Sequence, residues 1–180
     1  MKSISSFISN YSFFLLVILI IGHSFILVKL VFFPYPEFFI LPYLTNAGLI
    51  PYKEIVDQHF PGLFFLPLNA AVLGLSDAGV ARIWLIVITA INNLFIFLIA
   101  RKISKSEFVA LLASVIFTFW HPFWGGWVLW IDSFIPLILL PAFYLSYRII
   151  NSKNTDFRKL TILLGFIFSL GVILKQITLP

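Results

Sequence analysis

Long runs of apolar residues dominate this sequence and limit the folds that it can adopt. Residues 11–33 form one nearly unbroken run, and further runs cover residues 81–100, 108–120, 127–147 and 160–174. A helix needs about 20 apolar residues to cross a bilayer. The chain has 61% hydrophobic and 11% charged residues, whereas soluble domains carry about 25% charged residues. We therefore expect an all-α polytopic membrane protein with about five transmembrane helices.

Basic residues predict how these helices are oriented. They concentrate at the N-terminus and in two loops: Lys2, then Arg101, Lys102 and Lys105, then Arg148, Lys153, Arg158 and Lys159. The positive-inside rule places all three segments in the cytoplasm, provided that residues 61–75 do not span the membrane. That segment is short and contains Pro67, so we expect an amphipathic insertion at the outer surface. The expected protein is a multi-pass protein of the plasma (inner) membrane, with a cytoplasmic N-terminus.

The predicted organisation of residues 1–180 is the amino-terminal part of one membrane domain. Residues 11–33 form its first helix, residues 34–80 its extracytoplasmic loop and residues 81–180 its later helices. Pro36 suits the first turn of a short helix running towards Asn46, which Pro42 would interrupt or bend.

The loop holds most of the charged residues that face outward. Lys53, Glu54, Asp57 and His59 lie within the stretch 48–61. Ionisable groups among membrane segments usually mark a functional site. The alternative is an ordinary hydrated loop whose charges have no role.

Other polar and aromatic residues favour structural interpretations. His23 lies inside the first helix, and we expect it to hydrogen-bond to a neighbouring helix rather than to titrate. His121 lies in a predicted short aromatic loop before Pro122. The tryptophans near the outer helix ends are expected to be interfacial anchors: Trp120, Trp124, Trp127 and Trp130.

Several function classes have no sequence support. There are no cysteines and only 3 scattered histidines, so thiolate and structural zinc sites are not expected. No glycine-rich phosphate loop, Gly-x-Ser-x-Gly elbow or His-Glu-x-x-His helix occurs. The net charge of +5 fits cytoplasmic basic loops, and no nucleic-acid partner is expected.

From residue 33 onward the pattern resembles the GT-C superfamily of lipid-dependent glycosyltransferases, in particular bacterial relatives of the protein O-mannosyltransferases and the aminoarabinose transferase of lipid A. An acidic residue follows the first helix, then come a Gly-x-x-Pro-Tyr-x-acid element, a polar step into a proline, an arginine opening the second spanning helix and a helix ending in Lys-Gln. The matching residues are Glu37; Gly48, Pro51, Tyr52 and Glu54; Asp57, His59 and Pro61; Arg82; and Lys175 with Gln176. Glu54 stands where aspartate is commoner in the family.

The resemblance implies transfer of a hexose-type sugar, with inversion, from a polyprenyl-phosphate donor to a glycan, lipid or protein acceptor of the cell envelope. It implies a carboxylate as general base, for which the candidates are Glu37, Glu54 and Asp57. It also implies groups that hold the phosphate, for which the candidates are Lys53, His59, Arg82 and Lys175. No metal ligand is assigned, and dependence on a divalent metal is left open.

Several alternatives remain at this point. Arg82 would otherwise pair with Asp77 or Asp57 or act as an interfacial anchor, and Lys175 would otherwise end its helix by snorkelling. Because such enzymes usually have more helices, we expect this chain to be an amino-terminal portion that is incomplete alone. The competing functions are a non-enzymatic transporter or flippase fragment, or an inactive remnant.

Overall fold

The computed structural model confirms an all-α polytopic membrane protein. It describes residues 2–56, 73–75, 77–151 and 157–175, with the backbone alone for residues 2–10, 34 and 36–39. In this part of the chain, five helices are long and apolar enough to cross a membrane. The elements in order are α1 (Lys2–Lys29), β1 (Phe33–Pro34), α2 (Pro36–Asn46), α3 (Ala78–Ser104), α4 (Glu107–Trp124), β2 (Val128–Leu129), the 3-10 turn η2 (Ile131–Ser133), α5 (Ile135–Asn151) and α6 (Phe157–Leu174).

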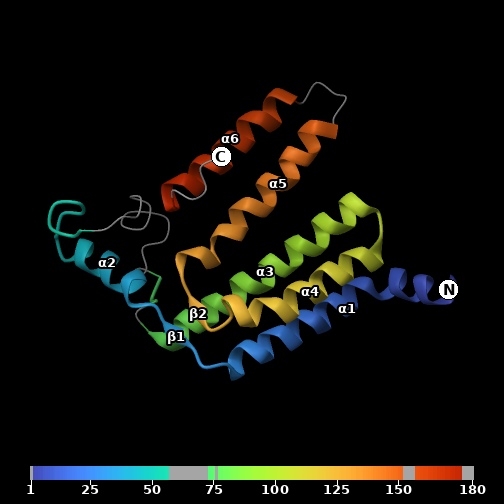
Figure 1. Cartoon of the computed structure of the whole chain (residues 1–180), viewed down its shortest axis with the longest axis horizontal. Helices are drawn as coiled ribbons and strands as arrows, with labels where there is room; N and C mark the ends of the chain where they lie inside the picture. The colour runs from blue at the N-terminus through green and yellow to red at the C-terminus, as the bar shows by residue number, and fades with distance from the viewer. Residues whose placement is uncertain (1, 57–72, 76, 152–156, 176–180) are drawn as a thin grey trace.

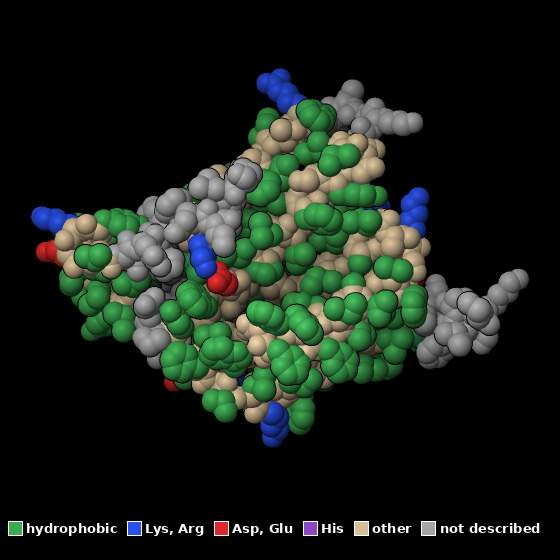
Figure 2. Space-filling view, viewed as in Figure 1, with side chains coloured by type: hydrophobic (Ala, Val, Ile, Leu, Met, Phe, Trp, Pro, Cys, Tyr) green, Lys and Arg blue, Asp and Glu red, His purple; other side chains and the backbone are tan. Residues whose placement is uncertain are grey.

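The long helices form two groups. Helix α4 packs against both α1 and α3, while α5 and α6 form a hairpin that contacts α3 through α5. Figure 1 shows the α5–α6 hairpin diverging from the other three long helices. Only 11% to 33% of the residues in each candidate span are buried within the chain. Hydrophobic side chains cover most of the surface visible in Figure 2, and most charged groups project at its margins, as expected for helices that face lipid.

One end of the bundle gathers the ends of several spanning helices. The guanidinium of Arg82, near the start of α3, donates hydrogen bonds to the carbonyls of Val28 (3.1 Å) and Leu30 (3.4 Å), at the end of α1. Strands β1 and β2 pair in parallel, so the segments that follow α1 and α4 also meet. Helix α1 therefore ends where α3 begins, and we call this the α1-exit end. The last turn of α3, which carries Lys102, and the turn to α4, which carries Lys105, lie at the opposite end.

A hydrophobic cluster holds the α1-exit end together. It joins residues from α2, the turn after α2, α3, β2, η2 and α6 in one buried group: Leu41, Ile55, Leu75, Ala81, Leu85, Ile88, Leu129, Ile131, Phe134 and Leu174. These elements are far apart in the sequence, so their packing fixes the relative positions of the side chains around them.

Helix α2 agrees with its sequence signals at both ends. Pro36 is its first residue, and the helix ends at Asn46 shortly before Gly48, whose φ of +96° favours glycine. The helix continues past Pro42, which is fully buried, so the predicted interruption is not seen. Of the predicted amphipathic insertion at 61–75, residues 61–72 lie outside the described residues, and residues 73–75 form a turn.

Three predicted helix boundaries are wrong. Helix α1 covers Lys2–Lys29 rather than 11–33, because the residues after it enter β1. The run 127–147 is not helical from its start, since β2 and η2 precede α5. His121 is not in a loop, because α4 continues through Pro122 to Trp124. Proline is tolerated in membrane helices where neighbouring groups satisfy the freed backbone.

Candidate functional site

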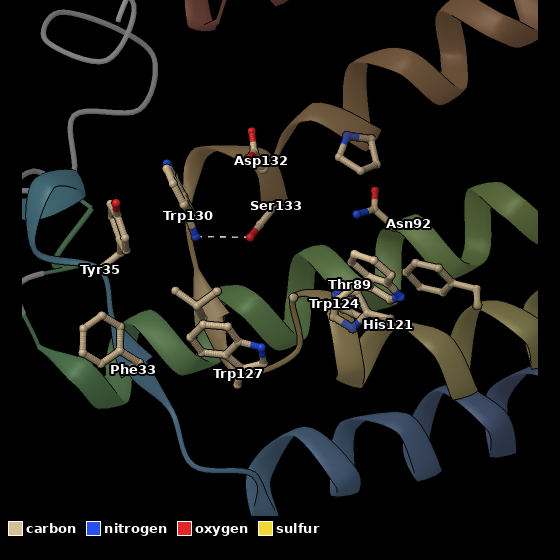
Figure 3. A pocket seen from close by; sticks show the side chains of 14 residues that line it. Phe33, Tyr35, Thr89, Asn92, His121, Trp124, Trp127, Trp130, Asp132 and Ser133 are labelled. Atoms are coloured by element: carbon tan, nitrogen blue, oxygen red, sulfur yellow. Dashed lines mark hydrogen bonds between the residues drawn. The ribbon is translucent and has the colours of Figure 1, made fainter. Parts of the chain in front are cut away.

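A pocket of about 410 Å³ lies at the α1-exit end, between α3, α4 and the segment that connects α4 to α5 (Figure 3). Its size falls in the range of about 300–1,000 Å³ that is typical of small-molecule sites. Aromatic side chains form a large part of its wall: Phe33, Tyr35, Phe117, Trp124, Trp127 and Trp130. Its polar lining is Thr89 and Asn92 from α3, His121 from α4, and Asp132 and Ser133 from η2.

Local backbone contacts shape the outer part of this pocket. The backbone N–H of Trp130 donates to Oγ of Ser133 (3.2 Å), and the N–H of Ser133 donates to the carbonyl of Trp130 (3.0 Å). Below them, Gly126 is buried against the neighbouring helices. A Cβ atom at this position would lie 2.7 Å from Cα of Pro122 and 2.8 Å from Cδ2 of Leu27, so glycine permits this close approach.

Asn92 provides an unsatisfied polar group in the inner part of the pocket. Its side chain is only 4% exposed, and its Oδ1 accepts no hydrogen bond from the described residues. Leaving a buried acceptor unpaired costs about 1–3 kcal/mol. Thr89 lies three residues earlier on the same face of α3, and Figure 3 shows both residues on this helix. Asn92 is therefore a strong candidate for contacting a ligand.

The adjacent Asn93 has a different role. Its Nδ2 donates a hydrogen bond to Oγ1 of Thr118 on α4 (2.9 Å), and both side chains are buried. Such bonds link membrane helices, with an average strength of about 0.6 kcal/mol. Oδ1 of Asn93 also has no partner among the described residues, but only Asn92 lines the pocket.

Two histidines lie beside the inner part of the pocket. The rings of His23 and His121 meet edge to face, with centroids 5.1 Å apart, and both rings contact Phe117. Among the described residues, neither Nε2 of His23 nor Nδ1 of His121 has a hydrogen-bond partner. The expected hydrogen bond of His23 to a neighbouring helix is therefore not seen at Nε2, and the ring contacts α4 through aromatic packing.

An ion pair and an aromatic stack lie at the outer rim. Nζ of Lys175, just after α6, is 2.6 Å from Oδ1 of Asp132 and 5.4 Å from the ring centroid of Trp130. The Trp130 ring stacks on Tyr35, with centroids 4.1 Å apart. The predicted phosphate ligand Lys175 thus reaches the pocket from the far end of the sequence.

Lys53 and Glu54 lie in a short exposed turn after α2. Oε2 of Glu54 accepts a hydrogen bond from the backbone N–H of Ile50 (2.8 Å). Ile55 is buried in the hydrophobic cluster and anchors the turn to it. Neither Lys53 nor Glu54 lines the pocket of Figure 3.

The remaining predicted residues are only partly described. Glu37 occupies the first turn of α2, but its side chain lies outside the described part, and Asp57 and His59 lie outside it entirely. Arg82 binds the end of α1 as stated above, and its guanidinium lies 5.4 Å from the ring centroid of Phe32. Asp77 caps α3 by accepting from the N–H of Val80 (2.8 Å). A phosphate-binding role for Arg82 stays a prediction.

No protein-family model, curated protein or solved structure matches this chain. Over the residues with described side chains, no group of three or more His, Asp or Glu residues is close enough to hold a metal ion. The site is interpreted from its own residues.

Sequence reasoning did not select Asn92, Thr89, Asp132 or Ser133 as site residues. One signal was present for Asn92, because Asn92 and Asn93 are adjacent amides inside the apolar run 81–100. Polar groups at membrane depth are costly and usually face the protein interior or a cavity. For Ser133 no comparable signal exists, since its place follows from the packing of η2.

Proposed function

We propose that this chain belongs to a membrane glycosyltransferase of the GT-C type, which transfers a sugar with inversion from a polyprenyl-phosphate donor to an acceptor at the extracytoplasmic face. One observation supports this most strongly. Residues from distant parts of the sequence, the loop after α1 and Lys175 after α6, meet at the α1-exit end beside a pocket. In this proposal the α1-exit end faces outward, the N-terminus is cytoplasmic and the membrane is the plasma membrane.

The transfer needs a carboxylate to remove the proton of the acceptor hydroxyl. Glu37 is favoured because it follows β1 by three residues and lies in the first turn of a helix held at the α1-exit end. Asp132 follows β2 by three residues, and the register pairs Pro34 with Leu129. The parallel pairing therefore brings these two acidic positions to the same end. Glu54 and Asp57 remain the alternative bases.

The leaving group needs positive charge near the developing phosphate. Lys175 suits this role because its ammonium lies at the pocket rim and is held beside Asp132. Lys53 and His59 are further phosphate ligands in this proposal. The exposed apolar surface of the spans lets the prenyl chain of the donor stay in lipid while its phosphate reaches the rim.

The experiment compares membranes from cells that lack the gene for this protein with membranes from complemented cells. Transfer from radiolabelled polyprenyl-phosphate hexoses is measured for the wild type and for Glu37→Gln, Glu54→Gln, Asp57→Asn and Asp132→Asn. General-base catalysis is worth about 10²–10⁴-fold in rate, so one variant is expected to lose that factor while donor binding is retained. If complementation with the complete wild-type gene restores no transfer activity, the result would favour a transporter or flippase, or an inactive remnant.

The essential base is expected among Glu37, Glu54 and Asp57. Normal turnover in all three of those variants, each inserted at the wild-type level, would contradict the mechanism. A large loss of transfer rate confined to Asp132→Asn would identify Asp132 in η2 as the base.

A further inference from the structure

The unpaired amide oxygen of Asn92 restricts what the pocket can hold. Oδ1 is a hydrogen-bond acceptor, and the side chain is buried among residues that line the pocket. An acyl or prenyl chain would cover this oxygen without pairing it, which is unfavourable. A fully deprotonated oxyanion brings more acceptors and no donor. The group that satisfies Asn92 must therefore donate a hydrogen bond.

The charge of the pocket further restricts the class of ligand that fits. Asp132 is the only carboxyl group among the described lining residues, and it is paired with Lys175 at 2.6 Å. A buried ammonium would lack a counter-charge beside Asn92. A neutral hydroxyl can donate a hydrogen bond to Asn92 without adding an uncompensated charge to the pocket.

The walls fit a ring that carries hydroxyls at its edge. The side chains of Trp124 and Trp127 line the pocket, and Thr89 lies with Asn92 on α3 (Figure 3). Aromatic side chains offer an apolar face for the C–H surface of a ring, while the α3 side offers polar atoms for its edge. A volume of about 410 Å³ accommodates a small polar ring.

We propose that this pocket is a binding subsite for a neutral pyranose ring, with a ring hydroxyl donating to Oδ1 of Asn92 and the ring packed against the aromatic wall. The choice of a sugar as the hydroxyl-bearing ring rests on the proposed function. The ring belongs either to the lipid-linked donor or to a glycan acceptor, and both present the same hydroxyl chemistry.

Binding is tested with the purified protein in a detergent that has no sugar headgroup. The probes are methyl α-D-mannopyranoside, methyl β-D-glucopyranoside and methyl β-D-galactopyranoside, with tetrahydropyran as the ring without hydroxyls. Tryptophan fluorescence reports occupancy because Trp124, Trp127 and Trp130 line the pocket. At least one glycoside is expected to bind, and tetrahydropyran is not.

The variants distinguish the effect of a change in the pocket from the effect of a change elsewhere in α3 or α4. Asn92→Leu is expected to weaken glycoside binding about threefold to tenfold, the usual effect of one hydrogen bond. Asn93→Leu is the matched control, since Asn93 bonds Thr118. Ser114→Ala is a second control, because Ser114 is buried with an unpaired hydroxyl but does not line the pocket. Equal loss in Asn92→Leu and in either folded control overturns the proposal, as does the absence of glycoside binding.

Two further arms distinguish the sources of the ring. If the pocket takes the donor sugar, Asn92→Leu weakens the binding of a short-chain prenyl-phosphate hexose by the same factor. The methyl glycoside then competes with this donor for the pocket. If it takes the acceptor, both ligands bind together and only the glycoside depends on Asn92. Glycoside binding without transfer activity would retain the subsite and reject the glycosyltransferase. Transfer activity without glycoside binding would reject the subsite and retain the glycosyltransferase.

Discussion

Tyr35 and Trp130 stack with ring centroids 4.1 Å apart and an angle of 13° between their planes. Each follows directly after one of the two paired strands, whose last pair is Pro34 with Leu129. The stack therefore continues the parallel pairing by one residue on each side, through side chains. It joins the segment that leaves α1 to the segment that leaves α4, at the rim of the pocket.

This stack is expected to contribute measurably to stability. Aromatic pairs are worth about 0.5–1.5 kcal/mol beyond the area that they bury. A double-mutant cycle with Tyr35→Leu and Trp130→Leu should give a coupling free energy in that range, from unfolding in detergent. Tyr43→Leu is the control, since Tyr43 is 66% exposed. Strictly additive effects of the first two substitutions would show that the stack does not stabilise the fold.

Gly126→Ala is expected to destabilise the protein by about 1–3 kcal/mol, the usual cost of overpacking. The added methyl group would meet the backbone of Pro122 and the side chain of Leu27, so α1 and α4 would have to separate. Gly125→Ala is a matched control, because a Cβ there has nothing within 4 Å. Thermal unfolding of both variants measures the difference, and equal stability of the two would rule out this close contact.

The two adjacent amides of α3 are expected to respond differently to replacement by leucine. Asn92→Leu removes an unpaired buried acceptor and should leave stability unchanged or raise it, by at most about 1–3 kcal/mol. Asn93→Leu also removes an unpaired oxygen, but it breaks the hydrogen bond to Thr118. Its stability should therefore be lower than that of Asn92→Leu by about 0.6 kcal/mol or somewhat more. Unfolding of both variants without ligand gives the comparison. A loss of stability in Asn92→Leu would indicate that this amide already has a partner.

Labelling of single cysteines is expected to place the two ends of the bundle on opposite sides of the membrane. The chain has no native cysteine, so each introduced thiol reports one position. Val56→Cys, at a residue that is 94% exposed, should react with a membrane-impermeant maleimide added outside intact cells. Lys105→Cys should react only after permeabilisation. Labelling of both from outside would contradict the proposed orientation.

Substitution of Lys175 is expected to weaken donor binding more than it lowers the stability of the fold. Its pair with Asp132 is partly exposed, and such pairs contribute about 0–1 kcal/mol. Hydrogen bonds to charged groups are worth about 1.5–3 kcal/mol, so Lys175→Met should raise the KM for a polyprenyl-phosphate sugar roughly tenfold or more. Lys175→Arg keeps the charge and should retain most of the affinity. An unchanged KM in Lys175→Met would remove this residue from the phosphate site.

The spanning helices could be predicted because their signals are local. Length and hydropathy identify a membrane helix without knowledge of its neighbours, and Pro36 with Asn46 bounded α2 in the same way. The segment from Trp127 to Phe134 could not be predicted, because its apolar composition is compatible with helix. Its actual structure depends on pairing with β1, which is remote in the sequence.

The candidate site was predictable only in part. The outer loop was selected from its charges, and Lys175 from a resemblance, yet Lys53 and Glu54 do not line the pocket. The pocket depends on how α3, α4 and η2 pack, and no single segment encodes that. Asn92 was visible as a polar residue in an apolar run, but whether it faces a neighbouring helix or a pocket is decided by the packing of the helix, as the contrast with Asn93 shows.

The pairing of β1 with β2 has a consequence for biosynthesis. The ribosome releases Phe33 long before Val128, its partner in the register, at a rate of about 5–20 residues per second. During that interval α3 and α4 must be inserted, and the β1 backbone has no β2 strand to bond. The nascent first loop thus depends on later helices to complete its structure, and insertion defects in α4 should expose it to surface proteases.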